Sequence, residues 1–409
     1  MKFVENINED EYTKFVITHP YSHFLKSYEW GELSKSRGLI PHYVGLKEKE
    51  KLVATALILE KKLPLGYSYY YIPRGYTIDY NNYELLKNFT FKIKEYAKKN
   101  KAIFFKIDPD IKLHTIDKNA NVVNDGNNNY ELVNYLKKIG FHRKKLNLYF
   151  ENMQPRFTFR LDTTKDIDII RKNYSKSVIR WIKVANKFGV EVKEAEKNEI
   201  KEFIRLMKIT EKRQGFFSHE YGFYPKLYDL FSKIDAISLL IAYVNIDNIL
   251  KVIDNDLKVC EDTKKREKLE LQREHFYKLS TDSKMVAVSS YINIHYGNKS
   301  WYLYGANDLN YKDTYANYKL FDFQIKLSHD FGKEIFDEFG TIGDPNSSKP
   351  VAGLHEFKKK FGAEYTEFIG EFTYILNPFL YFVFTKLVVL YRKPMKFIRI
   401  IKVKLQNIK

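Results

Sequence analysis

The sequence contains a single cysteine, Cys260, among its 409 residues. This excludes a disulfide framework and fits a reducing compartment. The N-terminus, MKFVENINEDEYTKF, carries acidic residues and no apolar core, so it does not have the pattern of a secretory signal peptide. The longest apolar run, residues 378–391, contains Lys386 and is shorter than the roughly 20 residues that a membrane-spanning helix needs. We therefore expect a cytoplasmic protein.

Several chemical signatures are also absent. The sequence has no glycine-rich phosphate loop, no dinucleotide fingerprint, no Gly-x-Ser-x-Gly elbow and no His-Glu-x-x-His pair. His19 and His23 are four residues apart, but Pro20 and the lack of a carboxylate partner argue against a metal site. The pyrophosphate loop of coenzyme A-dependent acyltransferases is not visible either. These absences favour catalysis by positioning and electrostatics, with no cofactor and no metal.

Charge of one sign dominates, because the formal net charge is +18. Residues 171–187 hold six lysines and arginines without an acid, and residues 392–409 are also basic and acid-free. Such an excess predicts an anionic partner, which could be a nucleic acid, an acidic lipid surface or a phosphorylated substrate. A solvated helix face is the alternative for either run.

Two stretches of the chain repeat the same order of elements. Residues 68–109 and 300–340 each open with an aromatic strand pattern, pass through a polar segment into a helix, and end in a short apolar strand. A pair of strand patterns precedes each stretch. The repeat predicts an α+β protein with two related domains, one at 1–150 and the other at 151–245 with 280–375.

Residues 246–279 interrupt the second domain with a helical pattern, in which apolar residues recur every three or four positions. A single helix of this length would separate the flanking strands by roughly 45 Å. A helical hairpin that turns near residues 260–266 keeps the strand ends together, so we expect a projecting antiparallel arm.

The C-terminal segment, residues 376–409, begins apolar and ends as a basic amphipathic helix. Its lysines and arginines fall on one helical face and its apolar residues on the other. Such a helix can lie on an anionic membrane. The alternative is a helix packed on the protein's own surface.

Two residues stand out as candidates for catalysis. Asp108 follows a predicted strand and precedes Pro109, at the kind of strand edge where α/β proteins bind ligands, although an ordinary turn would also place an aspartate there. Lys358 lies in HEFKKKFG, where Phe357 and Phe361 share one helical face and Lys359 and Lys360 can point to solvent. Lys358 could hold an oxyanion at the rim of this aromatic wall; a solvated basic helix is the alternative.

Six motifs in order give the chain a strong resemblance to a known family. They are SYEWGELSKSRG, YYYIPRG, KIDP, SKSVIRWIKVANKFGVEV, WYLYGAN and FKKKFGAEYTEFIGEF. Together with the helical arm, they resemble the Fem family of non-ribosomal peptidyltransferases, up to about residue 375. The resemblance implies two acetyltransferase-like domains, with a coiled-coil arm in some members. It also implies transfer of an aminoacyl group from aminoacyl-tRNA, as co-substrate, to an amine of a peptidoglycan precursor, either lipid II or the soluble UDP-MurNAc-pentapeptide.

The resemblance also implies roles for individual residues. Lys358 matches the family lysine proposed to stabilise the oxyanion, and Asp108 matches the family aspartate that acts as a base or positions the amine. Tyr296 matches one precursor-binding tyrosine of the family, and a second falls at Phe223 or Tyr224, of which Tyr224 keeps the hydroxyl. The family's N-terminal lysine falls on Ser34, so that Lys35 is one residue away. Arg74 could supply positive charge where the family's arginine is not preserved.

Two other classes of function remain open at this stage. One is an acyltransferase on the same fold that uses another activated acyl donor. The other is a non-catalytic protein that binds RNA or a membrane surface through charge. Peripheral association with the inner face of the membrane through residues 378–409 is expected if the acceptor is lipid-linked. The sequence leaves the transferred amino acid and the oligomeric state open.

Overall fold

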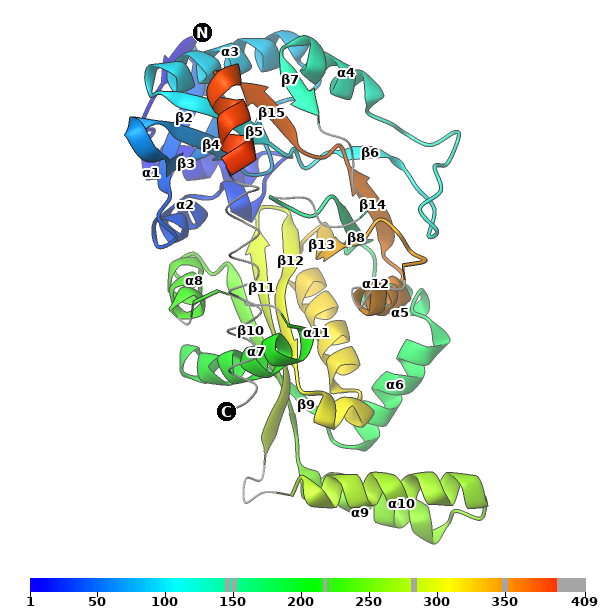
Figure 1. Cartoon of the computed structure of the whole chain (residues 1–409). Coiled ribbons are helices and arrows are strands. Elements are labelled where there is room, and N and C mark those ends of the chain that lie inside the picture. Colours follow the sequence, from blue (N-terminus) through cyan, green and yellow to red (C-terminus); the bar gives the residue numbers. More distant parts are fainter. Residues whose placement is uncertain are drawn as a thin grey trace.

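A computed structural model describes residues 1–143, 148, 153–215, 219–220, 222–280, 285–347 and 352–387. Two mixed sheets form the centres of two domains, and Figure 1 shows the first domain above the second with a pair of helices projecting from the far end. The expected α+β class, with two tandem domains and an inserted antiparallel helical arm, is confirmed.

The first sheet has the strand order β1-β2-β3-β4-β5-β15-β7. Its strands are β1 (Lys2–Val4), β2 (Ile40–Glu48), β3 (Lys51–Lys62), β4 (Ser68–Ile72), β5 (Ala102–Ile107), β7 (Phe141–Arg143) and β15 (Phe372–Ile375). The helices of this domain are α1 (Glu9–Thr18), α2 (Tyr28–Lys35), α3 (Tyr83–Lys99) and α4 (Tyr130–Lys138).

The second sheet has the order β6-β14-β8-β13-β12-β11-β10-β9. Its strands are β6 (Lys112–Thr115), β8 (Phe157–Asp162), β9 (Glu191–Ala195), β10 (Ile237–Val244), β11 (Val286–Tyr296), β12 (Lys299–Asn307), β13 (Ile335–Thr341) and β14 (Glu364–Phe368). Its helices are α5 (Ile167–Lys172), α6 (Lys176–Lys187), α7 (Ile200–Gln214), α8 (Phe223–Ser232), α11 (Ala316–Asp330) and α12 (Ala352–Lys358).

The repeat inferred from the sequence corresponds to β4-α3-β5 in the first domain and β12-α11-β13 in the second. In both, the two strands pair in parallel, which requires the helical crossover between them. Helix α3 begins where Asn82 accepts a hydrogen bond from the Leu85 N–H, and it buries Phe89 and Ile93 against the sheet. The ends of β5 and β13 therefore occupy equivalent places in the two domains.

Two strands belong to the sheet of the other domain. Strand β6, from the first half of the chain, pairs with β14 in the second sheet. Strand β15, near the end of the described chain, lies between β5 and β7 in the first sheet. Each sheet therefore takes one strand from across the division at residue 150 that the sequence pattern suggests. An alternating strand pattern fixes which face is buried, but not which neighbour the strand pairs with.

The arm consists of α9 (Ile246–Lys258) and α10 (Thr263–Lys278), which lie side by side and project away from the second domain (Figure 1). Ile249, Ile253 and Phe276 are buried at its base. The turn contains Cys260, and Asp262 caps α10 by accepting a hydrogen bond from the Lys265 N–H. This turn lies where the sequence pattern placed it.

A shared apolar cluster joins the two domains. It contains Tyr12, Phe24 and Trp30 from the first domain, and Tyr296 and Trp301 from the second. The ring centroids of Phe24 and Trp301 are 5.0 Å apart, in an edge-to-face arrangement. Such a pair contributes about 1 kcal/mol beyond the burial of its area. The cluster therefore holds the domains in a defined mutual position.

The C-terminal segment is described as far as residue 387. Residues 378–387 form a helix against the first sheet, where Phe104 contacts Tyr381 and Phe384 at ring distances of 5.1 and 5.5 Å (Figure 1). The basic part of the expected amphipathic tail, residues 388–409, lies outside the described residues. Among the helices that are described, none is both long and apolar enough to cross a bilayer.

Candidate active site

Asp108 lies directly after β5, in the interior of the protein. Its carboxylate accepts hydrogen bonds from the backbone N–H of Arg74 at 2.7 Å and from the hydroxyl of Tyr71 at 3.0 Å. Burial raises the pKa of Asp108 to about 7, although the charge and N–H of Arg74 oppose this shift. An aspartate with this pKa can accept a proton and release it again near neutral pH.

The turn after β4 explains how Arg74 reaches Asp108. Arg74 and Gly75 both adopt left-handed backbone conformations, with φ values of 55° and 71°. A Cβ atom at Gly75 would lie 2.4 Å from the hydroxyl oxygen of Tyr80, so the tight turn requires glycine. The turn points the Arg74 N–H at the carboxylate, so one of the two donors that hold Asp108 belongs to the backbone.

The side chain of Arg74 is also used within the fold. It is buried, donates to the carbonyl oxygen of Pro155 at 3.2 Å and lies over the ring of Phe368 at 4.9 Å. Its Nε has no hydrogen-bond partner among the described residues. Arg74 thus supplies positive charge beside Asp108, and its role in substrate binding stays a prediction.

Lys358 ends helix α12 and is 2% exposed, whereas Lys359 and Lys360 are only partly buried. Its ammonium donates to three backbone carbonyls, those of Glu338, Phe339 at 3.0 Å and Gly340 at 2.9 Å. An ammonium has three N–H donors, so all three are occupied here. Burial lowers the pKa of Lys358 to about 8, which leaves it mostly protonated at neutral pH.

The three carbonyls belong to a bulge in β13. The pairing of β13 with β8 shifts register between Asp337 and Gly340, and Phe339 adopts a left-handed φ of 59°. Asp337 accepts a hydrogen bond from the Phe339 N–H at 2.8 Å and thereby stabilises the bulge. The carboxyl of Glu338 is fully buried and accepts no hydrogen bond from any described residue, and burial raises its pKa well above the usual range.

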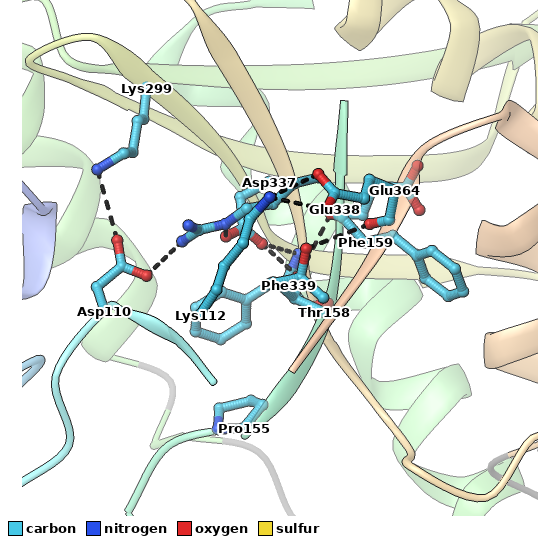
Figure 2. A network of polar contacts seen from close by, with 12 residues as sticks. Asp110, Lys112, Pro155, Thr158, Phe159, Lys299, Asp337, Glu338, Phe339 and Glu364 are labelled. Carbon is cyan, nitrogen blue, oxygen red and sulfur yellow. Dashed lines mark hydrogen bonds and ion pairs between the residues drawn. The ribbon is translucent and has the colours of Figure 1, made fainter. Parts of the chain in front are cut away.

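A buried ionic network lies between Asp108 and the bulge. Figure 2 shows Asp110 with Lys299 on one side of this network, and Asp337, Glu338 and Phe339 on the other. Arg160 connects the two sides, because it donates to Asp110 and, at 2.9 Å, to Asp337. Burial alone would raise the pKa of Asp110, but Arg160 and Lys299 hold it well below its usual range. The network therefore contains charged groups without access to water.

The two predicted precursor-binding tyrosines lie in the apolar cluster between the domains, and Tyr296 is the cross-strand neighbour of Lys299 in the network. Tyr224 and Tyr296 are each 1% exposed. The ring of Tyr224 packs against Phe203 and Tyr304 at 5.0 and 5.4 Å. The hydroxyl of Tyr296 is buried and finds no hydrogen-bond partner among the described residues. Both hydroxyls must become accessible before either can contact a precursor.

Lys35 is the most exposed of the predicted site residues and pairs with Glu32 on its own helix, at 2.7 Å. Nearby, the charge of Arg37 adds to burial in lowering the pKa of His219 to about 4. His219 hydrogen bonds to Tyr304 at 2.8 Å, and Tyr304 packs against Tyr224. Arg37 lies in the motif SYEWGELSKSRG but was not predicted as a site residue.

Comparison with known proteins gives matches along nearly the whole chain. A model of the FemAB family matches residues 7–388. A protein named lipid II:glycine glycyltransferase from Staphylococcus epidermidis is 28% identical over 401 residues, covering 92% of this chain and 93% of that protein. Its namesake from Staphylococcus aureus is 29% identical over 406 residues, with the same coverage. A crystal structure of FemX has a TM-score of 0.78 and 26% identity, and the match covers 94% of this chain and 99% of that one.

Proposed function

Because this chain belongs to the FemAB family, we propose that it transfers an aminoacyl group to the stem-peptide amine of lipid II and so builds the interpeptide bridge of peptidoglycan. The observation that carries the proposal is the similarity to lipid II:glycine glycyltransferases over 92% of the chain. These relatives favour glycine as the transferred residue, and aminoacyl-tRNA is the proposed donor. The proposed location is the cytoplasmic face of the membrane.

The reaction needs a base and a site for negative charge. The acceptor amine attacks the ester carbonyl carbon of the donor, a C–N bond forms, the ester C–O bond breaks, and the leaving ribose oxygen takes a proton. An ester is already activated towards an amine, so this transfer requires no metal and no nucleotide hydrolysis. We assign the amine proton to Asp108, whose pKa of about 7 suits a general base.

Lys358 is assigned to the oxyanion of the tetrahedral intermediate. Its charge lies in a buried site, where electrostatic attraction is stronger than in water. Since its three N–H donors are bound to carbonyls of the bulge, direct contact with an oxyanion requires one of these bonds to be exchanged. Without that exchange, Lys358 acts through its charge alone.

Helix α6 supports an RNA-linked donor. Lys176, Arg180, Lys183 and Lys187 recur at intervals of four, three and four residues, which places them in one stripe along the helix. A groove of about 660 Å³ lies beside this stripe, between α5, α6 and α11. Its lining includes five cations and two acids, namely Arg171, Lys172, Lys183, Lys319, Lys326, Asp168 and Asp322. A cationic stripe of this kind suits a phosphodiester backbone.

Binding of RNA can be tested without catalysis. We expect replacement of Lys176, Arg180 and Lys183 by glutamine to weaken binding of deacylated tRNA and to reduce the slope of log affinity against log salt by about 2 to 3. The matched control replaces Lys98, Lys137 and Lys138, which are exposed on helices of the first domain. Equal slopes for the two triple variants would contradict the assignment of α6.

The acceptor's lipid anchor is consistent with the C-terminal helix. Phe379, Phe382 and Leu387 are 73, 59 and 57% exposed, although they lie on a helix whose other side packs on the first sheet. Exposed aromatic and aliphatic side chains next to a basic segment are typical of interfacial membrane binding. We therefore propose that residues 378–409 hold the protein at an anionic membrane surface.

A single assay tests the function. The purified protein is incubated with lipid II and a total charged tRNA pool, and the lipid product is weighed by mass spectrometry. The proposal expects a gain of one aminoacyl residue, and the mass names the amino acid. A gain on the soluble nucleotide precursor alone would contradict the lipid-linked acceptor. No gain on either acceptor would mean that the chain shares the fold of its relatives without this activity. Another acyl donor or a binding role would then be favoured.

A further inference from the structure

Arg160 is the residue through which the two candidate catalytic regions meet. It lies on β8, is 9% exposed, and faces Asp337 as its cross-strand neighbour. Its Nε donates to Asp337 at 2.9 Å, while one terminal nitrogen donates to Asp110 of the other domain. The guanidinium also lies over the ring of Phe368 at 4.6 Å. These contacts fix it on three sides.

On one side, the network reaches the loop that carries Asp108. Asp110 follows Asp108 after a single residue, Pro109, whose ring fixes the backbone between them. Lys299 adds a second cation to Asp110 at 3.5 Å and also donates to the carbonyl oxygen of Ser22 at 3.1 Å. A shift of Asp110 would therefore be passed on to Asp108 through a short and stiff segment.

On the other side, the network reaches the carbonyls that hold Lys358. One carboxylate oxygen of Asp337 accepts from Arg160, and the other accepts from the Phe339 N–H and the Thr158 hydroxyl. The carbonyls of Glu338, Phe339 and Gly340 surround the Lys358 ammonium (Figure 2 shows the labelled bulge residues). Asp337 thus ties Arg160 to the position of Lys358.

We propose that Arg160 is a positioning residue that holds Asp108 and Lys358 in register across the boundary between the domains. The inference rests on the proposed function for its catalytic consequence, but the mechanical link stands on the contacts alone. Arginine suits this task because its rigid, planar guanidinium can donate to two carboxylates at once, in fixed directions. A lysine in its place keeps the charge and provides a single donor centre.

The alternative is that Arg160 only stabilises the domain interface. The variant Arg160→Lys distinguishes the positioning role from the stabilising role. It keeps a positive charge beside Asp110 and Asp337 within the buried cluster that also contains Lys299. The matched control is Arg205→Lys, because Arg205 also bonds a carboxylate and a backbone carbonyl, those of Glu202 and Ala287, away from the network.

The first measurement is hydrogen–deuterium exchange, which needs no activity. We expect Arg160→Lys to increase exchange in both segments 103–111 and 335–341, and Arg205→Lys to leave both unchanged. An increase in only one segment, or in neither, would overturn the proposed link. This result stands even if the wild-type protein transfers nothing in the mass-spectrometric assay, an outcome that would refute the proposed function separately.

The second measurement is a double-mutant cycle on the transfer rate. We expect Arg160→Lys to lower kcat by about 100-fold, the loss typical of a small misplacement of reacting groups. The KM for the donor and the KM for the acceptor should each change less than about threefold. In Asp108→Asn or Lys358→Met backgrounds, the same substitution should have a much smaller effect, since the group it positions is already lost. A lowered melting temperature with unchanged kcat, or full additivity in both backgrounds, would overturn the proposal.

A third variant keeps the proposal testable if Arg160→Lys fails to fold. Asp110→Asn keeps the Arg160–Asp337 pair but removes the negative charge through which Arg160 and Lys299 hold the first domain, leaving at most a neutral hydrogen bond. We expect faster exchange in 103–111 with little change in 335–341, together with a loss of kcat. If Arg160→Lys does not fold, unchanged exchange and unchanged kcat in Asp110→Asn would overturn the proposal.

Discussion

Strands β5 and β13 occupy the same place in the two repeats, yet they end in opposite chemical environments. β5 runs straight into Asp108, an acceptor held by one backbone N–H and one hydroxyl. β13 bulges at Phe339, and its carbonyls hold the donor Lys358. An ionised carboxylate has about four acceptor positions, so Asp108 keeps acceptor capacity for a further proton donor that reaches it in the interior. Lys358 must first release a carbonyl.

This difference suggests that the repeats have divided two tasks. The first domain provides a group that is ready to take a proton, and the second provides a positive charge that is locked into the backbone. Burial moves both groups towards neutrality, since it raises the pKa of Asp108 to about 7 and lowers that of Lys358 to about 8. Two groups of opposite charge therefore titrate within a narrow range of pH.

The largest loss in kcat is expected when the Lys358 ammonium is removed. We expect Lys358→Met to lower kcat on the order of 10³-fold, because a positive charge at the oxyanion is lost and three buried carbonyls lose their donor. Single-turnover transfer measures the loss, and circular dichroism reports whether the fold survives. The control is Lys359→Met, on the neighbouring and partly exposed lysine, which should retain activity within about threefold. Similar losses in both variants would contradict the role of Lys358.

Removal of the Asp108 carboxylate should cause the next largest loss in kcat. Asp108→Asn keeps an oxygen that can accept from the Arg74 N–H but removes the base, so we expect roughly a 100-fold loss in kcat. Because burial disfavours the ionised form of Asp108, the variant should be at least as stable as the wild type above pH 7, as urea denaturation can check. Activity within tenfold of the wild type would assign Asp108 to structure; Asp117→Asn, in an exposed loop, is the control.

The pH dependence of kcat sharpens the comparison further. We expect the rate to rise about tenfold per pH unit up to about pH 7, as Asp108 loses its proton, and to fall above about pH 8, as Lys358 loses its own. Asp108→Asn should remove the acidic limb and leave the alkaline one. A profile in which both limbs persist in this variant would show that another group serves as the base.

The smallest effect on kcat is expected at Glu338, whose backbone carbonyl accepts a hydrogen bond from Lys358. Burial raises the pKa of Glu338 well above the usual range and so favours the neutral carboxyl, whose shape and charge glutamine imitates. Glu338→Gln should therefore change kcat by less than about threefold. A loss above tenfold, measured under the same single-turnover conditions, would mean that Glu338 exchanges a proton during the reaction.

The sequence located the repeats, the arm and the two candidate catalytic residues, because each has a local pattern. Helical periodicity distinguishes the arm, and the spacing of Phe357 and Phe361 singles out Lys358 from the two lysines that follow. The structure places Lys358 in the interior. Its proposed role in the reaction stays a prediction, as do those of Asp108, Arg74, Lys35 and the two tyrosines.

Arg160 had no such local signal. In FTFRLD the apolar residues alternate with Thr158 and Arg160, and this pattern predicts a strand whose polar face meets solvent. The loop after β5 covers that face instead and brings Asp110 to the arginine. Only the pairing of distant segments creates the site. For the same reason, the exchanged strands β6 and β15 were not foreseen.

The position of β15 also has a consequence for synthesis of the protein. Because β15 fills the gap between β5 and β7, the first sheet remains incomplete until residue 375 has emerged from the ribosome. Until then, β5 exposes an unpaired backbone edge, the kind of surface that pairs with other chains. Most strands of the first sheet are therefore synthesised early, but the sheet is completed only near the end of synthesis. A chain released before Phe372 would be an aggregation hazard rather than a functional half.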